Sequence, residues 1–239
     1  MRIRLALIAA AALVLVGCKK NVGDAAQPHE EVFVLVDLSE TWHNDHTDSR
    51  NETLLSEIGQ GISLSADTVQ PPVAVQYRVI GAASLDREPV CDVLYQPSMI
   101  AVKGRRPDYL VKKIAELKSY LGTDCPAVIV RQPPEKLTQI SAAIDSVSQV
   151  PRIPKTPRFL IIASDFYEET GGALAPLSDL TGTKVLLIYR PVSQDHSDPL
   201  RLITRMDAWK ARLQQRGAEV VQMPDVGLKR AAVSGFLNQ

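Results

Sequence analysis

Three short stretches of the chain are apolar at successive positions, and they limit the possible folds more than any other feature. They are residues 32–36 (VFVLV), 159–163 (FLIIA) and 185–189 (VLLIY). A strand with one face in water alternates apolar and polar side chains, whereas a strand covered on both faces is apolar throughout. Stretches with helical periodicity separate the three strands, as is typical of a parallel sheet with helices on both faces. We therefore expect an open, doubly wound α/β fold with a mostly parallel sheet.

The remaining elements are placed by the spacing of their apolar residues. Helices are predicted at residues 51–64, 107–121, 134–147, 198–216 and 228–237. Further strands are predicted at residues 73–80, 90–95 and 218–223, of which 90–95 is a short edge strand. No internal repeat or second domain is visible, so residues 31–239 are assigned to one α/β domain.

The charge balance argues against nucleic acid as a partner. Lys and Arg together number 27, and Asp and Glu together also number 27, so the formal net charge is zero. A chain without a basic excess lacks the main electrostatic term for binding phosphates. The hydrophobic fraction of 45% also excludes an intrinsically disordered chain.

The first residues have the organisation of an export signal. Arg2 and Arg4 precede an apolar run at residues 5–16, which is too short to cross a membrane as a helix. The run ends in Val16-Gly17-Cys18, which resembles the lipobox of bacterial lipoproteins. This resemblance implies a signal peptide at residues 1–17 and a lipid on Cys18. The alternative is an ordinary signal peptide that contains a cysteine.

The resemblance to lipoproteins also predicts where the chain resides. Residues 18–30 are polar and turn-rich, as expected of a flexible tether between the lipid and the domain. In such lipoproteins an aspartate directly after the cysteine favours the inner membrane, and here Lys19 stands in that position. We therefore expect a chain of the cell envelope, anchored in the outer membrane and facing the periplasm.

Two cysteines remain after Cys18, and both are expected to be oxidised. Exported proteins form disulfides, so Cys91 and Cys125 are predicted to pair. Closing this loop would stabilise the fold by roughly 3–4 kcal/mol. The alternative is two separate buried thiols, and a zinc site would need additional ligands.

Polar residues follow two of the apolar strands, where a doubly wound sheet carries its ligand site. Asp37-Leu38-Ser39-Glu40-Thr41 follows the first strand, and Ser164-Asp165 follows the second. Together with Thr138, these residues resemble the von Willebrand factor A (vWA) family, whose first strand ends in Asp-x-Ser-x-Ser. A later loop of that family supplies a Thr and a central strand ends in Asp. The resemblance covers roughly residues 31–237 and implies a vWA-like, Rossmann-type fold.

The resemblance implies a metal-ion-dependent adhesion site (MIDAS) with five ligating residues. They are Asp37, Ser39, Thr41, Thr138 and Asp165. The sequence departs from the family at three positions, with Thr for the last Ser, Leu137 where Gly usually precedes the Thr, and Phe166 where Gly is common.

An all-oxygen set of this kind suits Mg²⁺, or another divalent cation such as Ca²⁺ or Mn²⁺. With only two carboxylates the cation stays electrophilic, so it can accept an acidic side chain from a partner protein. Two facing carboxylates need a cation, a lysine or hydroxyl hydrogen bonds to compensate them. No Lys or Arg lies within a few residues of Asp37 or Asp165, so a bound cation is expected. The structural alternative for Asp37 and Ser39 is a helix N-cap.

Residues 43–48 (HNDHTD) form a second candidate, because two histidines and two aspartates could bind a transition metal. A solvated loop is the preferred interpretation, since such sites draw ligands from several segments. Trp42 is expected at the exposed rim of the first site, as a packing residue or as a partner contact.

Enzyme motifs are missing from the sequence. Aspartate-nucleophile phosphatases of the haloacid dehalogenase type need Asp-x-Asp, and here Ser39 stands in place of the second Asp. Neither Gly-x-Ser-x-Gly nor a phosphate-binding glycine loop occurs. Three functions remain: a metal-dependent module that binds an envelope protein, a metal-free structural subunit of an envelope complex, or a hydrolase. The first is preferred, and no enzyme activity is expected.

Overall fold

The computed structural model describes residues 30–40, 42, 48–68, 73–81, 84, 88–95, 107–168 and 176–239. Within these residues one six-stranded sheet has the order β3-β2-β1-β4-β5-β6. Its strands are β1 Glu30–Asp37, β2 Val73–Ile80, β3 Cys91–Tyr95, β4 Arg158–Ser164, β5 Thr183–Tyr189 and β6 Glu219–Pro224. Only the β2–β3 pair is antiparallel. The predicted α/β fold with a mostly parallel open sheet is therefore confirmed.

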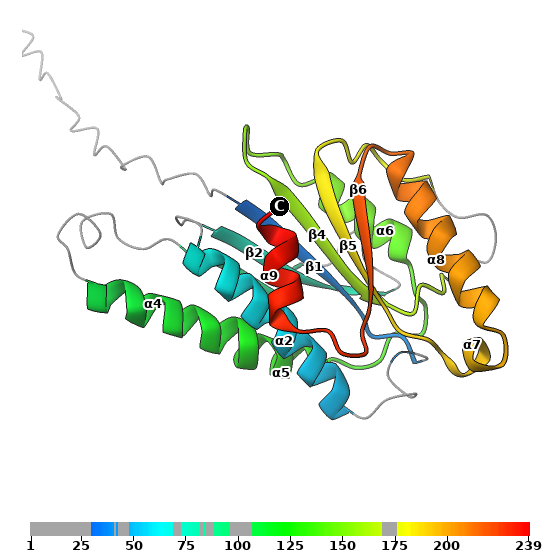
Figure 1. Ribbon diagram of the computed structural model, residues 1–239, viewed down its shortest axis with the longest axis horizontal. Coiled ribbons are helices and arrows are strands. Elements are labelled where there is room, and N and C mark those ends of the chain that lie inside the picture. The colour runs from blue at the N-terminus through cyan, green and yellow to red at the C-terminus, as the bar shows by residue number, and fades with distance from the viewer. Residues whose placement is uncertain are drawn as a thin grey trace, which may run out of the picture.

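Helices cover both faces of this sheet (Figure 1). One face carries α2 (Asp48–Thr68), α4 (Pro107–Ser119), α5 (Cys125–Val130) and α9 (Arg230–Leu237). The other carries α6 (Ile140–Ser148) and α8 (Pro199–Gln214), with the short α7 (Ser193–Ser197) before α8. A π-helical turn, η1 (Tyr120–Asp124), joins α4 to α5.

Strand β1 explains why the central strands are apolar throughout. Val32, Val34 and Val36 enter the core under α2 and α9. Phe33 and Leu35 enter the second core, under α6 and α8. All five side chains are at most 3% exposed, because the parallel strand is covered on both faces.

Three helix predictions differ from the structure. The helix predicted from residue 134 begins at Ile140, because the chain before it is extended and Glu135 N–H donates to the carbonyl of Leu38 (2.9 Å). The helix predicted at 107–121 ends at Ser119, and η1 and α5 follow it without having been predicted. The helix predicted at 198–216 is α8 (Pro199–Gln214), and the short helix α7 before it was not predicted. None of the described helices is long and apolar enough to cross a membrane.

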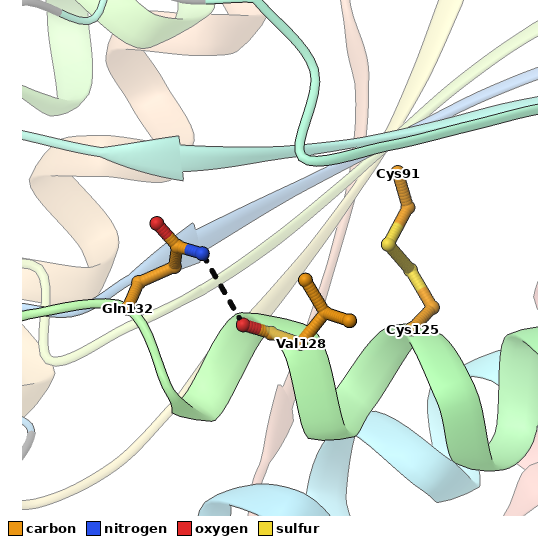
Figure 2. Close-up of a disulfide and its surroundings, with 4 residues drawn as sticks. All are labelled: Cys91, Cys125, Val128 and Gln132. Carbon is orange, nitrogen blue, oxygen red and sulfur yellow. Dashed lines mark hydrogen bonds between the residues drawn. A yellow bond between two sulfur atoms is a disulfide. The ribbon is translucent and has the colours of Figure 1, made fainter.

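The predicted disulfide between Cys91 and Cys125 is present, with the two Cα atoms 6.1 Å apart (Figure 2). Cys91 opens the edge strand β3, and Cys125 opens helix α5. Two residues beyond the end of α5, the Gln132 side chain donates to the carbonyl of Val128 (3.3 Å) (Figure 2). The disulfide therefore links β3, the only antiparallel strand of the described sheet, to the helices that cover this face of the sheet.

Candidate functional site

Two aspartates lie at the carboxyl ends of the central strands β1 and β4, which pair in parallel. Asp37 and Asp165 are both 0% exposed. One carboxylate oxygen of Asp37 accepts the Ser39 N–H (2.8 Å), and the other accepts the Ser164 hydroxyl (2.6 Å). The apolar strands thus deliver both carboxylates to one edge of the sheet, as expected for parallel strands.

The two carboxylates act on each other electrostatically. Burial, and after it the negative charge of Asp165, raise the pKa of Asp37 to about 7. Hydrogen bonds from Ser164 and Ser39 oppose this shift, because they stabilise the ionised form. Asp165 in turn accepts the Tyr167 N–H (2.9 Å), which fixes the turn that leaves β4. At neutral pH the two aspartates therefore carry negative charge that their hydrogen bonds compensate only in part.

The loop that carries Thr138 is tied to both strand ends. Before Thr138, Glu135 forms an isolated parallel bridge with Ser39. After it, the backbone N–H and the hydroxyl of Ser141 both donate to the Glu168 carboxylate (2.7 Å each), three residues beyond Asp165. Thr138 is 3% exposed between these two attachments.

Of the five residues proposed from the sequence, Asp37, Ser39 and Asp165 lie together at the ends of β1 and β4. Thr138 lies in the loop that is attached to both strand ends. Thr41 lies outside the described residues, as do Cys18, the tether before residue 30 and the segment 43–47. Among the residues that are described, no cluster of three or more His, Cys, Asp or Glu could hold a metal ion.

The expectation that no cationic side chain lies near the aspartates is wrong. Strands β4 and β5 pair with Ser164 opposite Tyr189, so Arg190 leaves β5 where Asp165 leaves β4. The Arg190 guanidinium is 1% exposed and acts electrostatically on Asp165. This neighbour was missed because only the order of strands, and not distance along the chain, brings it to the site.

Arg190 is shared with other partners. Its Nε donates to the Asp225 carboxylate, and its Nη1 donates to the Asn51 side chain (2.7 Å). A second arginine, Arg205, donates from Nε to the backbone carbonyl of Asp165 (3.0 Å). The arginines therefore offset only part of the negative charge on the aspartate pair.

Trp42 is 1% exposed, which corrects the expectation of an exposed rim residue. The Arg190 guanidinium lies 4.1 Å from the centre of its ring. The Trp42 backbone N–H points to the Ser39 hydroxyl at 3.5 Å. Of the two roles considered, the structure therefore gives Trp42 the packing role, between the first loop of the site and Arg190.

Phe166 occupies the position where the vWA family commonly has Gly, and its backbone gives a reason for that preference. Its φ of 61° lies in the left-handed region, which glycine adopts without strain. The Ser164 hydroxyl accepts the Phe166 N–H (2.8 Å), and the Trp209 indole donates to the Phe166 carbonyl (3.0 Å). These two bonds hold the left-handed turn directly after Asp165.

Comparison with known proteins gives similarities of fold only. No protein-family model and no curated protein matches the chain. The matching solved structures include the conserved hypothetical protein BatB from Bacteroides thetaiotaomicron (14% identity, 87% of this chain and 97% of that chain, TM-score 0.40). Another is a von Willebrand factor type A protein from Catenulispora acidiphila (12% identity, 87% of this chain and 41% of that chain, TM-score 0.42). A third is manganese-loaded TRAP from Plasmodium vivax (15% identity, 82% of this chain and 58% of that chain, TM-score 0.35). Because identities and TM-scores are low, the candidate site rests on this chain's own residues.

Proposed function

We propose that this chain is a vWA-like protein-binding module that binds its partner through a divalent cation at the carboxyl edge of the sheet. The observation that carries the proposal is the aspartate pair on the adjacent strands β1 and β4. Asp37 and Asp165 are completely buried, and the pKa of Asp37 is raised to about 7. A carboxylate pair in this state gains most from a cation.

The donor set fits a hard cation. Asp37, Ser39, Thr138 and Asp165 offer only oxygen atoms, and Thr41 would complete the set. Mg²⁺ suits these donors best, with Mn²⁺ or Ca²⁺ as alternatives. When bound, the ion would act as a Lewis acid that accepts a carboxylate from an acidic side chain of the partner.

The arrangement favours binding over hydrolysis. Both oxygens of Asp37 accept hydrogen bonds from Ser39 and Ser164, and its side chain is completely buried, so this carboxylate holds the loops in place. A second function, a metal-free structural or assembly subunit of an envelope complex, is favoured by one observation. Arg190 already places a positive charge near Asp165.

The partner is proposed to be a protein of the same envelope. A lipid on Cys18 would hold the chain at the outer membrane, facing the periplasm, and the residues between Cys18 and β1 would leave the domain free to reach its partner. An anchored module of this kind needs no membrane-spanning helix of its own.

The proposal is tested by capturing partners from an envelope extract on the immobilised protein. We expect one set of proteins to be retained with Mg²⁺ and released by a chelator. Asp37→Asn should fail to retain that set, and Asp108→Asn, an exposed aspartate in the first turn of α4, should behave like wild type. A set that is retained equally with the chelator and by Asp37→Asn would contradict the metal-dependent function and support the structural one.

A further inference from the structure

A surface pocket lies directly beside the candidate site, between the loop that leaves β4 and helix α8. Its volume is about 290 Å³. Phe166 and Trp209 contribute aromatic rings with centroids 5.9 Å apart, and they are 1% and 4% exposed. Ala208 is exposed on α8 and also lines the pocket, where its small side chain leaves space. The pocket is thus walled by apolar groups and open to the surface.

Two arginines of α8, seven residues apart, flank this pocket. The Arg205 guanidinium lies 3.8 Å from the centre of the Tyr167 ring, and that of Arg212 lies 4.9 Å from the centre of the Trp209 ring. Stacking on these rings holds both guanidiniums in place.

The negative charges that pair with these arginines lie behind them. Arg205 pairs with Asp195, and their side chains are 11% and 1% exposed. Arg212 pairs with Glu168, and their side chains are 19% and 3% exposed. In each pair the arginine is the more exposed member, although Glu168 also lines the pocket. This polarity complements an acidic partner and disfavours a basic one.

The pocket adjoins the candidate site along the chain. Phe166 directly follows Asp165, and Arg205 binds the Asp165 carbonyl while also bordering the pocket. An extended segment advances about 3.3 Å per residue, so a side chain about two to four residues from the one at the aspartates would reach the pocket. Beyond it, a wider groove of about 440 Å³ continues along α8 past Leu200, which is 71% exposed.

We propose that this pocket receives a large apolar side chain, aromatic or aliphatic, from an acidic segment of the partner protein. That side chain lies two to four residues from the acidic residue bound at the aspartate site. The inference rests on the proposed function, since it names the kind of segment that the site recognises. The partner's apolar side chain enters the pocket between Tyr167 and Ala208, above the buried rings of Phe166 and Trp209, and its neighbouring carboxylates meet Arg205 and Arg212.

The test uses synthetic peptides with a Gly/Ser background that carry one Glu and one Trp at every spacing up to about six residues. Binding is measured by fluorescence anisotropy of labelled peptides in Mg²⁺. We expect the tightest binding at the intermediate spacings, and at least tenfold weaker binding when either the Glu or the Trp is absent. Failure of every peptide to bind, or equal binding without the Trp, would overturn the inference.

A matched pair of variants locates the contact. Ala208→Trp fills the pocket and should weaken peptide binding at least tenfold. Ala211→Trp, at another exposed alanine of α8, should leave binding unchanged. Equal binding by the wild type and Ala208→Trp would overturn the pocket but not the metal site. Peptide binding could also be abolished by Ala208→Trp but unaffected by a chelator and by Asp37→Asn. That result would support the pocket and overturn the metal-dependent function. Thermal unfolding verifies that both variants are folded.

Discussion

The backbone of Phe166 combines an unfavourable angle with a favourable side-chain environment. Its φ of 61° costs a residue with a Cβ about 1–2 kcal/mol. Its ring is 1% exposed and packs against Trp209, and truncating a buried Phe to Ala costs about 3–5 kcal/mol. Packing therefore outweighs strain, which explains how a bulky residue occupies a position where the family commonly has Gly.

This balance makes an unusual prediction for truncation at residue 166. Phe166→Ala and Phe166→Gly should both destabilise the fold, but Gly should be the more stable of the two by about 1 kcal/mol, because only Gly avoids the left-handed strain. Phe159, buried in strand β4, is the control, where Ala should be more stable than Gly. Urea unfolding of the four variants gives the comparison. An Ala variant at 166 as stable as its Gly counterpart would contradict the strained turn.

Glu30, at the start of β1, predicts a pH dependence of stability. Burial raises its pKa to about 7, and its Oε2 has no hydrogen-bond partner among the described residues. The folded chain keeps a proton on Glu30 that the unfolded chain releases near pH 4.3, so this residue makes stability fall as pH rises from about 4 to 7.

Glu30→Gln should therefore gain stability relative to wild type above about pH 7, and the difference should shrink as the pH falls towards about 5. Asp37 titrates in both chains, so its effect cancels in the comparison. Denaturant unfolding across this range gives the two curves. A constant difference between them would show that the pKa of Glu30 is the same in the folded and unfolded chains, so that burial does not raise it.

At the scale of elements, the disulfide acts on β3 and α5. Cys91 and Cys125 are 34 residues apart in sequence, and their disulfide reduces the conformational entropy of the unfolded chain. Replacing both by Ser should lower the free energy of unfolding by about 3–4 kcal/mol. The measurement is urea unfolding with and without a reductant. Wild type should lose stability in the reductant and the double variant should not, whereas an unchanged wild type would contradict a structural role for the bond.

The sequence was most informative where an element's composition follows from its burial. Residues 32–36 are apolar because two cores cover β1, so the strand and the Asp37 that ends it could both be predicted. The segment before α6 could not, because its apolar spacing suits a helix, whereas the bridge from Ser39 to Glu135 holds it extended. A tertiary contact of this kind overrides local propensity and leaves no periodic signal.

The same limit applies to the candidate site. Asp37, Ser39 and Asp165 could be predicted because they end or follow apolar strands. Arg190 and Trp42 could not be placed, because their burial depends on which strands are neighbours and on how the first loop packs against them. A buried Arg directly after an apolar strand was the one available signal. Glu168 was missed as well, since its role is to bind the first turn of a helix distant in sequence.

For the molecule as a whole, the parallel sheet brings two carboxylates together at one end, where we propose that a cation binds. Asp37 and Asp165 lie far apart in sequence, and the only structural reason for their proximity is the pairing of β1 with β4. Binding of a cation to the folded chain alone would also stabilise the whole domain by mass action. Cation affinity should rise with pH, because the ion must displace the proton that Asp37 holds below a pH of about 7.

Isothermal titration of Mg²⁺ into the metal-free protein tests this claim most directly. We expect one ion to bind per chain. Binding should be lost in Asp37→Asn and in Asp165→Asn, and it should be retained in Asp108→Asn. Each asparagine variant is nearly isosteric with its aspartate, so the loss would reflect charge and not shape. The proposed cation site would be contradicted if the wild type bound neither Mg²⁺ nor Mn²⁺. It would also be contradicted if Asp37→Asn bound Mg²⁺ as tightly as the wild type.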